Sequence, residues 1–387
     1  MHGMTSYFIR RLLLIPLTFV CITFMVYAIM RLAPGGPIEQ AKTQLLLAMQ
    51  EGGSNIATSA TGELELPQDA IDQLKVYYKL HRTIPVGYLI WLGVWPDKER
   101  SVTPLPAKPK GYEAGIVEEW SEDFRYGVFS GILQGDFGMS YRYSDSVLDT
   151  IVSKFPVSIS FGLIGYLATW IVCIPLGVKK ALTHRSWFDT TTSLLVFVGY
   201  SIPGFVACLA LLLMFGTSLV WDIFPLGGFR SENWNAMWEA GNIWWCIKDQ
   251  AHHMVIPIIG YLMSGFATMT ILMKNSLLDN LGADYVRTAF AKGLSERRVI
   301  FIHALRNSMI PQCVSIGHAI GLLFAGSFLI EKTCNIPGMG LLGFNSLVER
   351  DYPVLMGTLV FLVLIRLLGN ILSDVILALV DPRVRFE

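Results

Sequence analysis

The sequence is poor in charge and has no excess of either sign. Charged residues make up 16% of its 387 residues, and 30 Lys and Arg balance 30 Asp and Glu. This balance gives no electrostatic reason to expect nucleic acid as a partner. Hydrophobic residues reach 53%, and the mean hydropathy is +0.49. This composition is typical of a polytopic membrane protein and unusual for a soluble enzyme.

Motifs for nucleotide binding and catalysis are also missing. No Gly-Lys pair occurs, so the chain has no P-loop and is not expected to bind ATP in that way. There is no Gly-x-Ser-x-Gly sequence and no His-x-x-x-His pair. His252 lies at a span entrance, where an interfacial hydrogen bond is favoured over metal ligation. We therefore predict that the chain is not an enzyme and holds neither a metal ion nor a cofactor.

The six cysteines give no disulfide framework. Four lie in apolar stretches and are interpreted as small apolar fillers: Cys21, Cys173, Cys208 and Cys313. Cys246 and Cys334 are both expected outside the membrane, where an oxidising compartment would permit a disulfide between them.

Six stretches are apolar and long enough to cross a bilayer as helices, which takes about 20 residues. They cover residues 12–30, 157–178, 190–216, 254–273, 312–330 and 354–379. The sequence therefore predicts an all-α polytopic membrane protein with six transmembrane helices.

Lys and Arg gather in the loops of one side, which identifies that side as cytoplasmic. These residues are Arg10, Arg11, Lys179, Lys180, Arg185, Lys274, Arg287, Lys292, Arg297, Arg298, Arg306, Arg383 and Arg385. Both termini are then cytoplasmic. The first apolar stretch could instead be a cleaved signal peptide, but it is long and ends in Arg31 without an Ala-x-Ala-like site.

The expected domains follow from these spans. Residues 1–31 hold the first transmembrane helix, residues 32–156 form an extracytoplasmic insertion, and residues 157–387 form a five-helix core. Within the insertion, residues 67–81 are predicted to form an amphipathic helix, between a Gly/Ser/Thr-rich loop at 52–62 and a Pro-rich connector at 103–110. Its acidic stretch around Glu118 is interpreted as a solvated surface in preference to a binding site.

A polar cytoplasmic loop, residues 274–310, separates the fourth and fifth apolar stretches. It predicts a short helix over residues 284–293, with Val286, Ala289 and Phe290 on one face and Gly293 at its end. Ser295 is placed to cap a second helix.

This loop resembles the coupling loop of ABC importer permeases, in which a short helix docks on an ATPase subunit. Other motifs extend the resemblance to the dipeptide, oligopeptide and nickel branch: Arg10 to Pro16, Gly135 to Ser140, Ile336 to Gly340, Arg350 to Pro353, and Asp381 to Arg383. The aligned Arg287-Thr288-Ala289 replaces the general Glu-Ala-Ala start. The long outward region resembles that of the larger permease of importers for microcin C and related peptides.

The resemblance implies a set of contacts with an ATPase. The expected coupling residues are Asp284, Tyr285, Arg287, Thr288, Ala289, Phe290, Lys292 and Gly293. Arg287 and Lys292 are available to pair with acidic groups on the ATPase. An alternative is that this basic amphipathic helix lies in the membrane interface.

Polar residues inside the apolar stretches are the candidates for a translocation path. Arg366, Asn370 and Asp374 are spaced four apart on one face of the last stretch, and His318 and Gln312 are possible neighbours. Asn370 and Asp374 could instead hold helices together, whereas Gly317 and Gly321 have the small-xxx-small spacing of a close helix approach.

The sequence therefore predicts a permease subunit of an ATP-driven importer in the bacterial inner membrane. The resemblance implies a second homologous permease, two ATPase domains that carry ATP and Mg²⁺, and an extracytoplasmic solute-binding protein. Two alternatives remain, a secondary transporter without an ATPase and a membrane receptor or scaffold that transports nothing.

Overall fold

The computed structural model describes residues 2–32, 82–97, 129–143, 145–218 and 220–380. The helix predicted at residues 67–81, the neighbouring loop and connector, the acidic stretch around Glu118 and the closing Asp381 to Arg383 motif lie outside these ranges. Within them the chain is mostly helical, with an isolated antiparallel β-bridge between Met139 and Ser146.

The chain divides into two compact units. One comprises residues 1–17, 151–345 and 358–387, and the other comprises residues 18–150 and 346–357. Four of the described helices have residues in both units. These are α1 (His2–Leu32), α5 (Val147–Leu182), α15 (Met339–Val348) and α16 (Tyr352–Val380).

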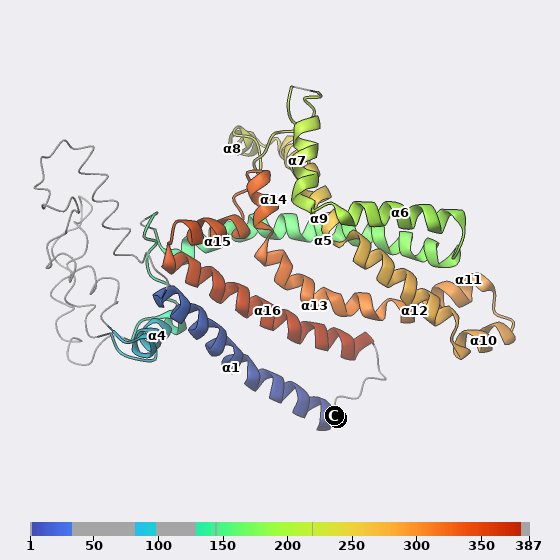
Figure 1. Ribbon diagram of the computed structural model, residues 1–387, viewed down its shortest axis with the longest axis horizontal. Helices are drawn as coiled ribbons and strands as arrows, with labels where there is room; N and C mark the ends of the chain where they lie inside the picture. The colour runs from blue at the N-terminus through green and yellow to red at the C-terminus, as the bar shows by residue number, and fades with distance from the viewer. Residues whose placement is uncertain (1, 33–81, 98–128, 144, 219, 381–387) are drawn as a thin grey trace, which may run out of the picture. The chain divides into compact units, whose positions relative to one another are not determined.

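The first unit also contains the helices that carry most of the candidate site (Figure 1). They are α6 (Trp187–Ser201), α7 (Gly204–Phe215), α8 (Trp234–Glu239), α9 (Ile243–Leu281), α10 (Asp284–Ala291), α11 (Glu296–Arg298), the π-helix η3 (Val299–Ala304), α12 (Leu305–Ser308), α13 (Ile310–Ala325) and α14 (Phe328–Thr333). Buried side chains of α5, α7, α9 and α14 form one apolar core, which includes Phe161, Leu212 and Ile330.

Three helices are long and apolar enough to span a membrane without a break: Ile9–Leu32, Val147–Leu182 and Tyr352–Val380. The third expected span is instead the pair α6 and α7, bent by 91°. The bend falls at Pro203, whose ring nitrogen cannot donate a helical hydrogen bond. α9 bends by 52° between Met263 and Gly265.

The fifth expected span is divided. α13 has 16 residues, which is about 24 Å of helix and shorter than the roughly 30 Å core of a bilayer. Gly326, in the left-handed region at φ 64°, separates it from α14. The described residues thus support up to five spans, and the count of six remains a prediction.

The second unit contains α4 (Ile84–Leu92) and the 3₁₀ helix η2 (Ile132–Gln134). The hydroxyl groups of Thr23 on α1 and Tyr88 on α4 lie 2.8 Å apart, and both side chains are buried. Two motifs from the sequence also meet in this unit. Ser140 hydrogen-bonds to the carboxylate of Asp351, and the amide of Tyr141 donates to the same carboxylate at 3.2 Å.

Candidate functional site

The predicted coupling helix is present as α10. It begins after Ala283 and ends at Ala291, and Gly293 follows with φ 78°. The amide of Gly293 donates to the carbonyl of Phe290 at 2.9 Å, and the amide of Leu294 donates to that of Ala289 at 3.4 Å. A left-handed glycine with such bonds is a common helix end. The predicted role of Gly293 in ending the helix is confirmed.

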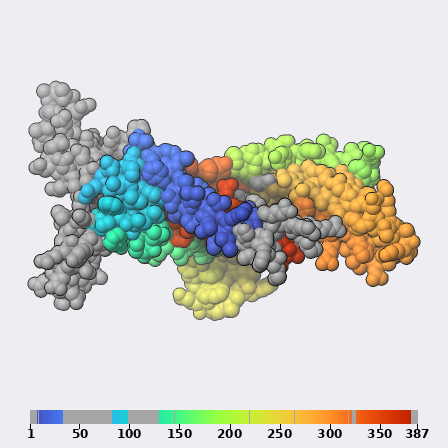
Figure 2. Space-filling model, turned by 90° about the horizontal axis from the view of Figure 1, so that it is seen from below, coloured from blue at the N-terminus to red at the C-terminus, as the bar shows by residue number. Residues whose placement is uncertain are grey.

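The apolar face of α10 is turned differently from the prediction. Val286 and Ala289 are 1% and 8% exposed and pack in a buried cluster with residues of α5 and α9, whereas Phe290 is 45% exposed. Val286 and Ala289 therefore hold the helix to its own chain and are not available to a partner. The surface left for a partner carries Phe290 with Arg287 and Lys292, all exposed. Figure 2 shows the orange surface of this region uncovered on the face in view.

The other predicted coupling residues support the helix locally. Tyr285 donates from its hydroxyl to Asn280 Oδ1 at 2.6 Å, and the Thr288 hydroxyl donates to the carbonyl of Asp284 at 2.9 Å. Arg287 lies 3.5 Å from Asp284, but both side chains are largely exposed. Such a pair contributes little to stability and stays available to a partner.

Ser295 occupies the predicted position before the second helix, but its side chain does not cap it. Its carbonyl accepts from the amides of Arg298 and Val299 at 2.9 and 3.0 Å, while its hydroxyl makes no capping hydrogen bond.

Two of the path candidates form a link between helices. Asp374 on α16 makes an ion pair with Arg11 on α1 and lies 3.4 Å from the hydroxyl of Tyr7. Arg11 also donates to the carbonyl of Asn370 at 3.1 Å. This geometry favours the alternative in which these residues hold helices together. Arg366, the third polar residue on this face of α16, has an exposed side chain.

The remaining path candidates, Gln312 and His318, both lie on α13. Gln312 is fully buried, and its side-chain amide donates to the carbonyl of Met269 at 3.2 Å. This bond ties α13 to α9, and the Gln312 side chain does not face open space. His318 lies on α13, but its side chain is outside the described part of the structure. A Cβ atom on Gly317 would clash with the backbone of Gly369, which confirms the predicted close approach at Gly317.

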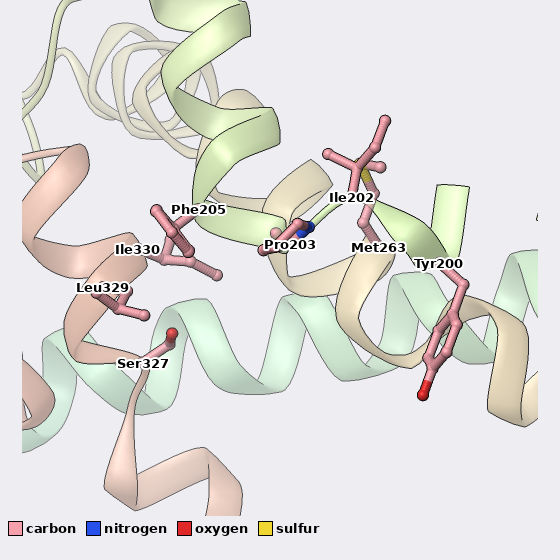
Figure 3. Close-up of a pocket in the computed structure, with 9 residues that line it drawn as sticks. Tyr200, Ile202, Pro203, Phe205, Met263, Ser327, Leu329 and Ile330 are labelled. Carbon is pink, nitrogen blue, oxygen red and sulfur yellow. The ribbon is translucent and has the colours of Figure 1, made fainter. Parts of the chain in front are cut away.

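A cavity that the sequence did not predict lies where helices are interrupted (Figure 3). It has a volume of about 290 Å³ and touches the α6–α7 bend, Met263 at the bend of α9, and Ser327 just before α14. Its lining residues are Tyr200, Ile202, Pro203, Gly204, Phe205, Met263, Ser327, Leu329 and Ile330. None is charged, so this cavity suits an apolar group.

Glu331 is a buried carboxylate that the sequence reasoning missed. It is 1% exposed and accepts a hydrogen bond from the amide of Leu341 at 2.7 Å, at the start of α15. Ser158 on α5 lies 3.5 Å from it and accepts from the amide of Met339 at 2.7 Å. A Cβ on Gly338 would lie 2.6 Å from the carboxylate carbon, so only glycine leaves room there.

The surroundings of Glu331 change its protonation. It lies beyond the end of the predicted fifth span and outside the spans that the structure supports. Burial raises the pKa of Glu331 to about 7, while hydrogen bonds from backbone amides, that of Leu341 first, act in the opposite direction. The only feature of the sequence that could have pointed to this buried carboxylate is a single acidic residue beside an apolar run.

The disulfide that the sequence left open between Cys246 and Cys334 is not formed. Cys246 and Cys334 are both free and buried. The thiol of Cys246 lies 3.7 Å from the carbonyl of Trp234, whereas Cys334 belongs to the same apolar core as Cys208. Cys246 and Cys334 thus lie in different surroundings.

Comparisons with known proteins show what this chain is similar to. Residues 173–386 match the family described as binding-protein-dependent transport system inner membrane component. The peptidoglycan transport system permease protein YejB of Agrobacterium fabrum is 34% identical over 99% of both chains. The inner membrane ABC transporter permease protein YejB of Escherichia coli O157:H7 is 35% identical, over 99% of this chain and 100% of the relative. The oligopeptide transport system permease protein AppB of Bacillus subtilis is 29% identical, over the same shares.

Proposed function

Because the chain belongs to the family of binding-protein-dependent transport system inner membrane components, we propose that it is a permease subunit of an ATP-driven importer for short peptides or peptide-like compounds. The observation that carries this proposal is similarity over 99% of the chain to a permease of an ABC transporter. Its place is the bacterial inner membrane, with both termini in the cytoplasm.

ATP energy reaches the chain through contact. α10 is fixed to its own chain by Val286 and Ala289, so its exposed Phe290 is free to enter a groove on an ATPase subunit. Arg287 and Lys292 beside it can pair with acidic groups at the rim of that groove. ATP and Mg²⁺ belong to that partner.

The substrate class follows from the named relatives. One is a peptidoglycan transport permease and another an oligopeptide transport permease, and the chemistry they share is a short peptide. Microcin C, a peptide conjugate, stays within this class and is the specific substrate we propose to test first. Cell-wall peptides are the second candidate, favoured by the name of the Agrobacterium relative.

The complete importer requires further subunits. We propose a second homologous permease, two ATPase domains and an extracytoplasmic solute-binding protein as partners. A secondary transporter would need no ATPase, and a receptor or scaffold would move no substrate.

Purification of the tagged chain from native membranes tests the proposal. We expect an ATPase and a second permease to copurify, and cells lacking the chain should lose uptake of microcin C, tripeptides or cell-wall peptides from a panel. Purification without any ATPase, together with unchanged uptake of the whole panel, would contradict it.

A further inference from the structure

Three helices of the first unit meet at the carboxylate of Asp189. α6 supplies Asp189 from its first turn, α5 supplies Lys180 and α9 supplies Lys274. The Lys274 ammonium lies 2.7 Å from each carboxylate oxygen, and that of Lys180 lies 3.3 Å from Oδ1. The side chains of Lys180, Asp189 and Lys274 are 1%, 7% and 15% exposed. This is a buried ionic link, in which loss of the Asp189 carboxylate would leave two ammonium groups without a counter-charge.

The turn between α5 and α6 folds around the same carboxylate. The amide of Arg185 donates to Asp189 Oδ2 at 3.1 Å. Lys180 also donates to the hydroxyl groups of Thr192 and Ser193 at 3.0 and 2.7 Å. Lys180 thereby fixes α6 to α5 through several bonds, whereas Lys274 donates both of its hydrogen bonds within the described residues to Asp189.

The residues beside the two lysines pack against α10. One buried apolar cluster joins α5, α9 and α10 and contains Val178, Ala181, Met273, Leu277, Val286 and Ala289. On α5, the neighbours of Lys180 in the chain therefore pack against α10. On α9, the neighbours of Lys274 do the same. Interiors packed in this way transmit a displacement instead of absorbing it.

α6 leads from this ionic link to the interior of the unit. It ends at Ser201, and the chain turns by 91° into α7 beside the cavity described above. A change in the position of α6 would therefore alter the bend and the cavity that it lines.

We propose that Asp189 is the positioning residue that transmits a displacement of α10 to α6 and its bend. This inference rests on the proposed coupling function. A shift of α10 moves the ends of α5 and α9, because their side chains share its apolar cluster. Lys180 and Lys274 lie on those ends, and both hold α6 through Asp189. Asp189 thus acts through other residues and touches neither ATPase nor substrate.

The test compares variants in the complete importer, purified through the full chain and reconstituted in vesicles. Lys274→Gln leaves Asp189 bound by Lys180 and the Arg185 amide, so it breaks one arm of the link. We expect it to assemble normally and to lower uptake per ATP hydrolysed by roughly tenfold, within the usual range of coupling between sites. Lys274→Arg keeps the charge and should retain wild-type coupling. Asp189→Asn should show the larger loss.

Asp279→Asn serves as the matched control, because Asp279 is an exposed acid on the same helix, α9, outside the link. It should behave as wild type. Wild-type uptake per ATP in an assembled Lys274→Gln complex would overturn the inference, as would loss of copurification in that variant, which would assign a purely structural role. If the wild-type complex shows no ATP-driven uptake, the proposed function itself fails.

Discussion

Two glycines at the ends of neighbouring helices make different demands on the backbone. Gly293, after α10, has φ 78°, whereas Gly282, after α9, has an ordinary φ of −77°. A side chain at positive φ costs roughly 1–2 kcal/mol. A Cβ atom at Gly282 would make only ordinary contacts, the nearest at 3.6 Å.

We therefore expect Gly293→Ala to reduce uptake several-fold and Gly293→Val to abolish it, with unchanged amounts of protein in the membrane. Gly282→Ala is the matched control and should transport normally. The measurement is uptake by each variant, normalised to the amount of protein inserted in the membrane. Normal transport by Gly293→Val would show that the end of α10 has no part in coupling.

Glu331 gives a pH dependence with a definite sign. In the folded chain it holds its proton up to about pH 7, whereas its ordinary pKa is 4.5. The folded state binds more protons between these values, so stability should fall as pH rises through this window. The shift corresponds to about 3 kcal/mol at most.

Glu331→Gln should abolish this contribution, and its Tm should change less than that of the wild type between pH 5 and 8. Thermal unfolding of the purified complex in detergent measures this, with the exposed Glu296→Gln as control. Equal pH dependence in Glu331→Gln and the wild type would remove Glu331 as the source.

At the scale of elements, α16 carries two kinds of polar residue. Asp374 is bound to Arg11 on α1, whereas Arg366, two helical turns away, has an exposed side chain. A partly exposed ion pair contributes on the order of 1 kcal/mol. Asp374 is thus suited to hold α1, and Arg366 to receive an anionic group of a substrate or a partner.

We expect Arg366→Leu to lose uptake while the complex still copurifies, and Arg366→Lys to keep much of it. Asp374→Asn should weaken assembly more than it changes substrate preference. Measuring uptake and copurification for the three variants separates the roles. Full uptake by Arg366→Leu would exclude it from the path.

The elements also show which features could be predicted. α10 and its end at Gly293 were predictable, because periodicity and a terminal glycine are local signals. The breaks at Pro203 and Gly326 were not, since a hydropathy window sums composition and does not register backbone angles. Asp189 and Lys274 are 85 residues apart, and no local pattern brings such residues together.

At the scale of the whole molecule, the Lys and Arg asymmetry predicts that the polar loop of residues 274–310 lies inside the cell. A cysteine introduced at Ser295, with the native cysteines replaced, should not react with an impermeant thiol reagent added to intact cells. A cysteine at Asn233 should react. Labelling at Ser295 without cell lysis would reverse the orientation and remove α10 from reach of an ATPase.

The central claim is that this chain forms a path driven by ATP on a partner. Its most direct test is uptake of a labelled peptide into vesicles that contain the complete importer, with ATP supplied on the α10 side. We predict uptake that requires ATP hydrolysis, stops with a non-hydrolysable analogue and is insensitive to ion gradients. Uptake driven by an ion gradient without ATP would contradict the account.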